Sequence, residues 1–133
     1  MRENILEEIR MKKIETKAAP AAIGPYSQAF VSGGFLFTSG QIPVDPVSGE
    51  VCGDNVEAQA ERVIANLAAV LEAAGTGFDK VVKTTCFLRD MADFAAFNGV
   101  YAKYFTSLPA RSCVAVRELP KGVLCEIELI AEV

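Results

Sequence analysis

Residues 54–88 read DNVEAQAERVIANLAAVLEAAGTGFDKVVKTTCFL, a helix pattern followed by a strand pattern, and this stretch decides the fold. The helix is predicted to begin after Asp54 or Asn55, either of which can cap its first turn, and to end before Gly75. Apolar residues recur along it at helical spacing and predict one buried stripe, made of Ala60, Val63, Ile64, Leu67, Leu71 and Ala74. Residues 81–88 are β-branched and aromatic, which predicts a strand. The domain therefore mixes helices with strands.

Strand patterns also lie on both sides of this stretch. Residues 28–32 and 35–39 are apolar, and Gly33-Gly34 joins them. A two-residue Gly-Gly link between apolar runs is typical of a tight β-hairpin with a type I′ or II′ turn. Further strands are expected at residues 12–15, 111–117 and 123–132, and a surface turn at residues 45–49.

A second helix is expected over about residues 91–105, capped by Asp90. Its aromatic side chains are predicted to face the core: Phe94, Phe97, Tyr101, Tyr104 and Phe105. The element order is then β-β-β-α-β-α-β-β, which indicates an α+β domain with both helices on one face of a sheet. Residues 11–133 form this single domain, and the amphipathic residues 1–10 predict an accessory N-terminal helix.

The composition fits one compact domain that associates with itself. A length of 133 residues is close to the usual domain size. Hydrophobic residues make up 51% of the chain before its 10 glycines are counted, whereas roughly 45–50% is usual with glycine included. No stretch approaches the roughly 20 consecutive apolar residues of a membrane helix. The excess is therefore expected in an interface between copies of the chain.

The residues that are missing exclude several kinds of chemistry. The chain has no histidine, so it lacks a Ser-His-Asp triad, a Cys-His pair and a histidine-based zinc site. Its net charge of −4 and its scattered cations argue against a general nucleic-acid surface. The four cysteines form no CxxC pair and follow no signal peptide, which favours reduced thiols in a cytoplasmic protein.

Two charged residues in the predicted closing strands, which we expect to be neighbours in the sheet, are candidates for chemistry. Arg111 opens an otherwise uncharged strand, where it can either pair with a carboxylate of the protein or bind an anionic ligand. Glu126 lies on an alternating strand, and periodicity alone allows either a solvated acidic face or a carboxylate that faces a pocket. The Gly/Pro-rich loops at residues 22–28 and 38–43 add hydroxyl and backbone N–H groups, although each loop alone is typical of a turn.

Taken together, these segments resemble one known family. The motifs that carry the resemblance are AAIGPYSQ, FTSGQIPVDPVSGE, NLAAVLEAAG, VVKTTCFLRDMADFAAFN, PARSCVAV and the terminal EIELIA. They follow the order found in the RidA/YjgF family of reactive-intermediate (enamine/imine) deaminases, from about residue 12 to residue 132. The N-terminal decapeptide is the one departure from that family.

The resemblance implies a chorismate-mutase-like α+β fold, assembled as a homotrimer with sites between subunits. It also implies hydrolysis of 2-aminoacrylate/2-iminopropanoate and 2-iminobutanoate to 2-keto acids and ammonia, without a cofactor or a metal. Arg111 matches the clamp for the substrate carboxylate, Glu126 the acidic residue beside the attacking water, and Cys113 the position whose backbone contacts ligand and water. The pocket-lining positions of the family are matched by Tyr26, Ser39, Gly40 and Asn98.

Two other functions are compatible with the sequence. One is a regulator that binds keto or amino acids through the same Arg111 pocket without turning them over. The other is a translation inhibitor or endoribonuclease, as older labels in this family suggest, although the acidic charge and the absence of histidine count against it. Turnover of an imine therefore separates the deaminase from both alternatives.

Overall fold

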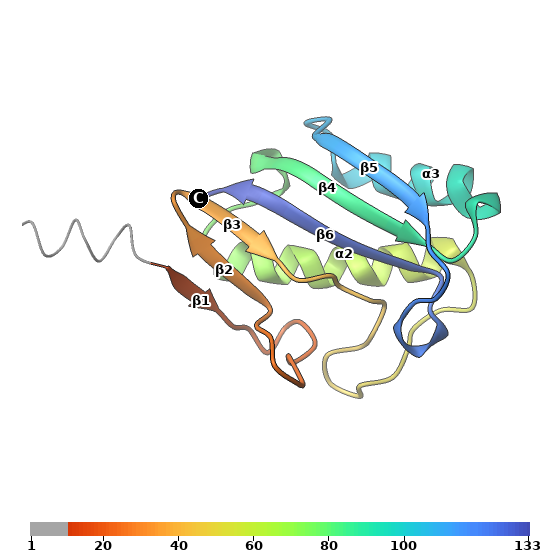
Figure 1. The fold of residues 1–133 in the computed structure, drawn as a ribbon, viewed down its shortest axis with the longest axis horizontal. Coiled ribbons are helices and arrows are strands. Elements are labelled where there is room, and N and C mark those ends of the chain that lie inside the picture. Colours follow the sequence, from red (N-terminus) through yellow and green to blue (C-terminus); the bar gives the residue numbers. More distant parts are fainter. Residues whose placement is uncertain (1–10) are drawn as a thin grey trace, which may run out of the picture.

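The computed structural model describes residues 11–133 as one sheet with two helices packed against it (Figure 1). The helix expected over residues 1–10 lies outside the described residues. The strands are β1 (Lys12–Ile14), β2 (Ala29–Ser32), β3 (Phe35–Thr38), β4 (Val81–Leu88), β5 (Ala110–Ala115) and β6 (Cys125–Glu132), and the helices are α2 (Val56–Ala73) and α3 (Phe94–Tyr104). Short 3₁₀ turns occupy Phe78–Lys80, Met91–Asp93 and Pro120–Gly122. The element order predicted from the sequence is confirmed.

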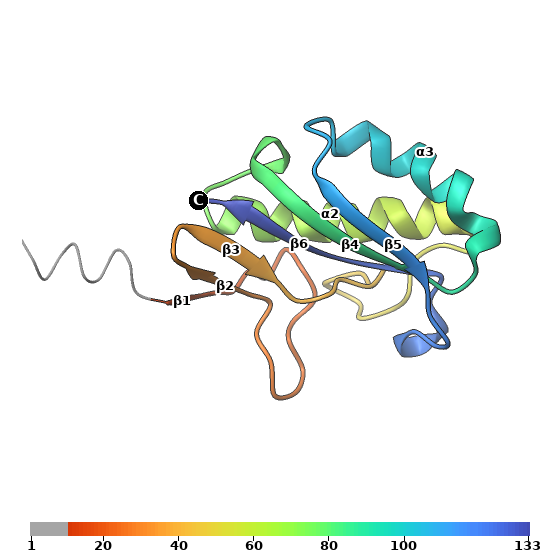
Figure 2. The ribbon, with the colours of Figure 1, turned by 45° about the horizontal axis from the view of Figure 1, so that its top comes forward.

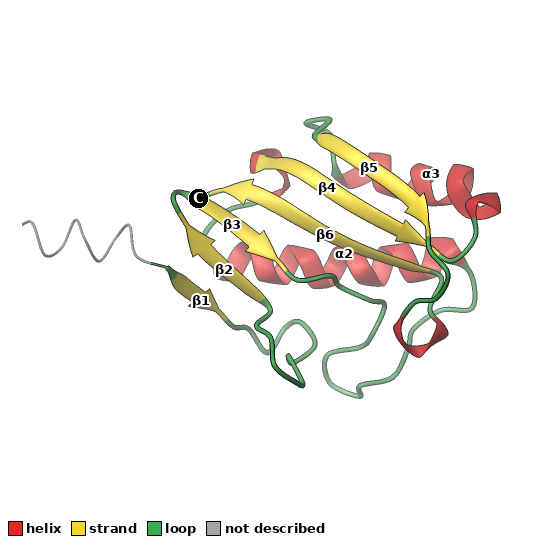
Figure 3. Ribbon diagram, in the orientation of Figure 1, coloured by secondary structure: helices red, strands yellow, loops and turns green. Residues whose placement is uncertain are grey.

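The six strands form one sheet in the order β1-β2-β3-β6-β4-β5. All neighbours are antiparallel except β4 and β5, which are parallel and are connected through α3. Figures 2 and 3 show α2 and α3 on the same face of the sheet, as the sequence predicts. Among residues 11–133 no helix is long and apolar enough to cross a membrane.

The Gly-Gly link forms the predicted hairpin. Gly33 and Gly34 have φ angles of 60° and 84°, and Ser32 pairs with Phe35 across the turn. A positive φ at both central residues is the type I′ geometry, whose twist matches that of the flanking strands. The resulting register buries Leu36 in the core beneath the helices.

Helix α2 begins and ends where its sequence predicts. The side chain of Asn55 accepts a hydrogen bond from the backbone N–H of Ala58 at 2.8 Å. Gly75 follows the helix with a φ of 77°, a left-handed conformation that a glycine adopts without a steric penalty. The predicted stripe is buried except for Ala74, which is half-buried at the C-cap.

The second helix starts later than predicted. The carboxylate of Asp90 accepts a hydrogen bond from the backbone N–H of Ala92 at 2.9 Å and so caps a 3₁₀ turn, and α3 begins only afterwards. The aromatic side chains do face the core, although Phe94 and Tyr104 are only half-buried.

Both closing strands are shorter than predicted. β6 starts at Cys125, since the N–H of the residue before it donates to Oε1 of Gln59.

The face of the sheet away from the helices is open within residues 11–133. Alternation along β6 places its glutamates on this open face, as the sequence predicts: Glu126, Glu128 and Glu132. Phe35, Phe37 and Val114 are 39%, 44% and 46% exposed. Their positions in β3 and β5 place them on the same side as these glutamates. A group of exposed apolar side chains is typical of an interaction surface.

Candidate active site

Arg111 lies near the start of β5, the edge strand that overlaps α3 in the view of Figure 1. Its Nη1 donates a hydrogen bond to Oδ1 of Asn98 at 2.7 Å. The central carbon of its guanidinium lies 4.7 Å from the ring centre of Tyr101 and 5.5 Å from that of Phe94. Within residues 11–133 no carboxylate lies at ion-pair distance from Arg111. Of the two roles that the sequence left open, the geometry therefore favours binding of an anionic ligand.

From the sequence, Phe94 and Tyr101 are expected only to pack in the core, and their contact with Arg111 is not predicted. Phe94, Asn98 and Tyr101 are separated by four and then three residues, and this spacing places them on one face of a helix. Because this helix face is followed by a strand with a single arginine, the spacing could have indicated that these three residues lie beside Arg111. We call Arg111, Asn98, Phe94 and Tyr101, together with Cys113, the arginine cluster.

Cys113 is the next residue of β5 on the same face as Arg111, and it is half-buried. Burial raises the pKa of its thiol, and the positive charge of Arg111 opposes this only in part. The thiol is therefore protonated at neutral pH and is a poor nucleophile. This favours a role for the backbone at Cys113, because β5 is an edge strand whose outer N–H and C=O groups lack a neighbour in the described sheet. Within residues 11–133 no group of three or more cysteine or acidic side chains could hold a metal ion.

Glu126 lies at the start of β6 on the open face of the sheet and is half-buried. Its carboxylate packs against Gly40 so closely that an added Cβ at Gly40 would collide with Oε2 of Glu126. Burial raises the pKa of Glu126, and the nearby charge of Glu128 adds to the shift. A carboxyl group with a raised pKa is better suited than an ordinary glutamate to accept a proton and then return it near neutral pH.

Two contacts hold Gly40 beside Glu126. The neighbouring Gln41 exchanges two backbone hydrogen bonds with the residue after Glu126, at 2.8 and 3.2 Å. Asn66 of α2 is fully buried and donates through Nδ2 to the carbonyl oxygen of Val44 at 3.0 Å. The loop that follows β3 is thus attached both to β6 and to a helix. This attachment fixes the close approach of the Gly40 backbone to the carboxylate.

Ser39 and Tyr26 lie close to Gly40. Oγ of Ser39 donates a hydrogen bond to the carbonyl oxygen of Ser27 at 2.6 Å, which ties the loop that carries Tyr26 to the end of β3. Tyr26 is 54% exposed, and together with Gly40 it lines a cavity of about 520 Å³. We call Glu126, Gly40, Ser39 and Tyr26 the glutamate cluster.

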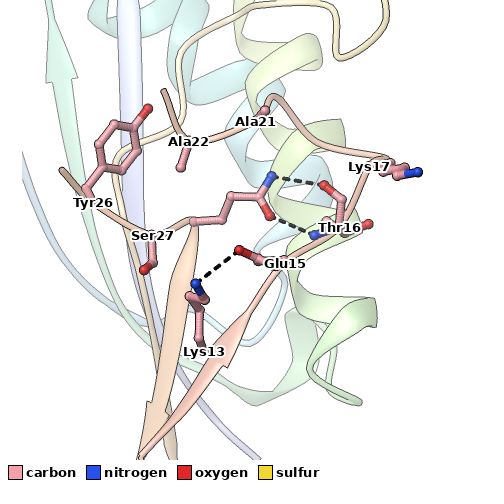
Figure 4. Close-up of a pocket in the computed structure, with 9 residues that line it drawn as sticks. Lys13, Glu15, Thr16, Lys17, Ala21, Ala22, Tyr26 and Ser27 are labelled. Carbon is pink, nitrogen blue, oxygen red and sulfur yellow. Dashed lines mark hydrogen bonds and ion pairs between the residues drawn. The ribbon is translucent and has the colours of Figure 1, made fainter. Parts of the chain in front are cut away.

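A second cavity, of about 580 Å³, lies on the other flank of the same loop (Figure 4). Gln28 crosses it, accepting a hydrogen bond from the N–H of Thr16 at 2.7 Å and donating one to the carbonyl of Thr16 at 3.0 Å. Lys13 pairs with Glu15 at 3.3 Å. Gln28 and Thr16 thus satisfy each other, as do Lys13 and Glu15, and Lys17 at this cavity is exposed. We therefore assign the cavity no chemistry beyond support of the Tyr26 loop.

The predicted site residues thus form two clusters and not one. The arginine cluster faces the helices, whereas the carboxylate of Glu126 projects from the open face. Strand β4 lies between β5 and β6, and Glu126 pairs with Phe87 of β4. The expectation that Glu126 lies on a strand next to that of Arg111 is therefore wrong, because β6 is inserted between β3 and β4. Within one chain the two charged groups stand on opposite sides of the sheet.

Fold and clusters together define a small α+β protein with an arginine that has no carboxylate partner within residues 11–133 and a separate, partly buried glutamate. The sequence profile of the family described as "Endoribonuclease L-PSP" matches residues 16–133. The chain is 52% identical over 124 residues to the 2-iminobutanoate/2-iminopropanoate deaminase of Salmonella typhimurium, covering 90% of this chain and 96% of that protein. It is 54% identical over 124 residues to a candidate regulator, AldR, of Lactococcus lactis, covering 92% of this chain and 98% of that protein.

Solved structures of the same family are also similar to this chain. The YjgF gene product of Escherichia coli has a TM-score of 0.86 and 50% identity, with 91% of this chain and 98% of that chain covered. The TdcF protein of E. coli, solved with bound serine, has a TM-score of 0.87 and 47% identity, with 92% and 98% covered. The chain belongs to the RidA/YjgF family. Its relatives carry the names deaminase, regulator and endoribonuclease, so family membership alone does not define the reaction.

Proposed function

We propose that this protein hydrolyses 2-imino carboxylic acids, and the enamines that tautomerise to them, to 2-keto acids and ammonia. 2-Iminopropanoate (the tautomer of 2-aminoacrylate) and 2-iminobutanoate are the smallest substrates of this class. The observation that carries the proposal is Arg111, whose guanidinium is held by Asn98 and has no carboxylate partner within residues 11–133. The name of the Salmonella relative and the serine bound to TdcF support the same ligand class. We place the protein in the cytoplasm, where its cysteines would remain reduced.

Arg111 would bind the carboxylate of the substrate. Its hydrogen bond to Asn98 uses one N–H of Nη1, and the remaining N–H groups can meet both oxygens of a carboxylate. Such a two-point contact fixes the orientation of the carbon that carries the nitrogen. An imine carbon is already electrophilic, so most of the catalytic effect would come from orientation.

Glu126 would activate the attacking water. Its carboxylate accepts one proton from the water while the water oxygen bonds to C2 of the protonated imine, which gives a neutral carbinolamine. Glu126 then returns this proton to the amine nitrogen. The C2–N bond breaks, the hydroxyl becomes the keto group, and the hydroxyl proton leaves with the ammonia as ammonium. The raised pKa of Glu126 suits both transfers.

This mechanism requires a site that two chains share. The arginine cluster and Glu126 lie on opposite faces of one sheet, so a substrate can touch both only where two chains meet. We therefore extend the proposal to a homotrimer in which Arg111 of one chain and Glu126 of the next complete each of three sites. Three head-to-tail contacts of this kind close a ring. The exposed apolar side chains of the open face would supply contact area.

The proposal is tested by generating the imine with an amino-acid oxidase and following the keto acid. The protein is expected to accelerate formation of pyruvate and of 2-oxobutanoate above the rate in buffer. A rate equal to that of buffer with both imines overturns the proposal. Thermal stabilisation by 2-oxobutanoate without turnover would instead support the regulator that the name AldR suggests. If RNA stays intact when incubated with the purified protein, the endoribonuclease function is excluded.

Gly40→Ala is expected to lower kcat by roughly 10²-fold, the cost of displacing a reacting group by about 1 Å. The added methyl group would collide with Oε2 of Glu126 and turn the carboxylate away. KM should change little, because the arginine cluster is untouched. Gly99→Ala is the matched control, since an added Cβ there meets nothing within 4 Å, and steady-state kinetics measure both variants. Full activity of Gly40→Ala would contradict the placement of Glu126 beside the attacking water.

Phe37→Asp is expected to separate the trimer into folded monomers. Phe37 is 44% exposed on the open face, so we expect the fold to tolerate the substitution, whereas a charge there opposes an apolar contact. Sedimentation should report three times 14.2 kDa for the unsubstituted protein and 14.2 kDa for the variant, with activity lost in parallel. Val47→Asp, at a turn residue that is 93% exposed, is the control. A monomeric unsubstituted protein would contradict the shared site.

A further inference from the structure

The ring of Tyr101 is a rigid platform beneath Arg111. It is 8% exposed and stacks on Phe105, with ring centres 4.3 Å apart and planes inclined by 20°. The guanidinium carbon of Arg111 lies 4.7 Å from the centre of the same ring. Tyr101 therefore packs against the core ring of Phe105 and also lies against the guanidinium of Arg111.

A hydrogen bond fixes the far end of this platform. The hydroxyl of Tyr101 lies 2.8 Å from Oγ1 of Thr84, a fully buried residue of β4. Burial raises the pKa of Tyr101, so the hydroxyl is neutral over the physiological range. Stacking on Phe105 fixes the plane of the Tyr101 ring, and the hydrogen bond to Thr84 fixes the position of its hydroxyl end. The position of the ring is thus determined before any ligand binds.

We propose that Tyr101 is a positioning residue: its ring holds the guanidinium of Arg111 in the orientation that receives a carboxylate. A free arginine side chain loses considerable rotamer freedom when it binds a ligand. An arginine that is already stacked on Tyr101, covered by Phe94 and bonded to Asn98 has lost that freedom beforehand, so the ligand gains affinity. The inference rests on the proposed role of Arg111 in binding carboxylates.

The test compares two substitutions of the ring. Tyr101→Met fills the space without an aromatic face and is expected to weaken binding of 2-oxobutanoate roughly tenfold by calorimetry. Tyr101→Phe keeps the face and loses only the bond to Thr84, and it should stay within roughly threefold of the unsubstituted protein. In steady-state kinetics with 2-iminobutanoate, Tyr101→Met should raise KM while kcat is largely retained.

Phe97→Met is the matched control. Phe97 is fully buried on the same helix, and its ring centre lies 6.0 Å from that of Tyr101. The described rings that lie over Arg111 are those of Phe94 and Tyr101, so Phe97→Met should lower the melting temperature without weakening the ligand. A loss of affinity in Phe97→Met equal to that in Tyr101→Met would assign the effect to packing and overturn the inference.

Other outcomes are equally decisive. If Tyr101→Met does not fold, Phe94→Leu removes the second ring over Arg111 from a half-buried position and is expected to weaken binding in the same direction. Unchanged affinity in that variant overturns the inference, as does a lack of 2-oxobutanoate binding by the unsubstituted protein. Binding that depends on Tyr101 without imine turnover would support the inference and contradict the proposed function. Imine turnover that is unchanged by Tyr101→Met, with unchanged affinity, would support the proposed function and contradict the inference.

Discussion

Arg111→Ala is expected to lower kcat/KM for 2-iminobutanoate by roughly 10²–10³-fold, the cost of removing one partner of a hydrogen-bonded charge pair. The variant loses the two-point contact that fixes the carbon to be attacked. The fold should survive, because Arg111 lies near the start of an edge strand and is only half-buried. The oxidase-coupled assay measures the loss, and calorimetry with 2-oxobutanoate should show that carboxylate binding fails with it.

Arg111→Lys separates charge from geometry. Lysine keeps the positive charge but offers neither the planar fork nor a flat surface for stacking on Tyr101. Activity should therefore fall between that of the unsubstituted protein and that of Arg111→Ala. If Arg111→Ala hydrolyses the imine as fast as the unsubstituted protein, the carboxylate clamp is not Arg111, and the proposed mechanism has no anchor.

The parts of the fold that depend on local patterns could be predicted from the sequence. The hairpin follows from Gly33-Gly34, because only residues that accept a positive φ can close a type I′ turn. The extent of α2 follows from the cap at Asn55, the apolar stripe and the stop at Gly75. Each of these signals lies within a few residues of the structure that it specifies, so no knowledge of the rest of the chain is needed.

The relation between strands was not predictable in the same way. Alternation along β6 places Glu126 opposite the core, but it does not state which strand lies beside it. The insertion of β6 between β3 and β4 is decided by long-range pairing. For this reason the sequence led to a single pocket with Arg111 and Glu126 on neighbouring strands, whereas the chain holds them on opposite faces.

The contact between Glu126 and Gly40 shows how the site and stability compete. A carboxyl group whose pKa is raised in the folded state costs stability once it is ionised. The sequence supplies glycine at position 40, where a side chain would collide with the carboxylate. The chain therefore keeps a partly buried charge that lowers the stability of the fold. Proton transfer by Glu126 would explain why this loss of stability is retained.

Glu126→Gln is expected to lower kcat by roughly 10²–10⁴-fold, the usual contribution of a positioned acid or base. The same variant should be more stable at neutral pH. Burial raises the pKa of Glu126 in the folded state. The penalty is therefore absent below the unfolded-state pKa and fully present above the folded-state pKa. Thermal unfolding of the two proteins should therefore converge in acid, and the acid limb of the kcat profile should lie above the range of an ordinary glutamate. Equal activity would contradict the role of Glu126.

Mixing two inactive variants tests the shared site. When Arg111→Ala and Glu126→Gln chains are refolded together in equal amounts, roughly a quarter of the sites should combine an intact Arg111 with an intact Glu126 from the next chain, given a closed ring of head-to-tail contacts. Activity should recover to about that fraction. Glu128→Gln, on the same strand and face, is the control and should be active alone. A mixture as inactive as its two components would contradict a site built from two chains, because random assembly cannot avoid forming the intact combination.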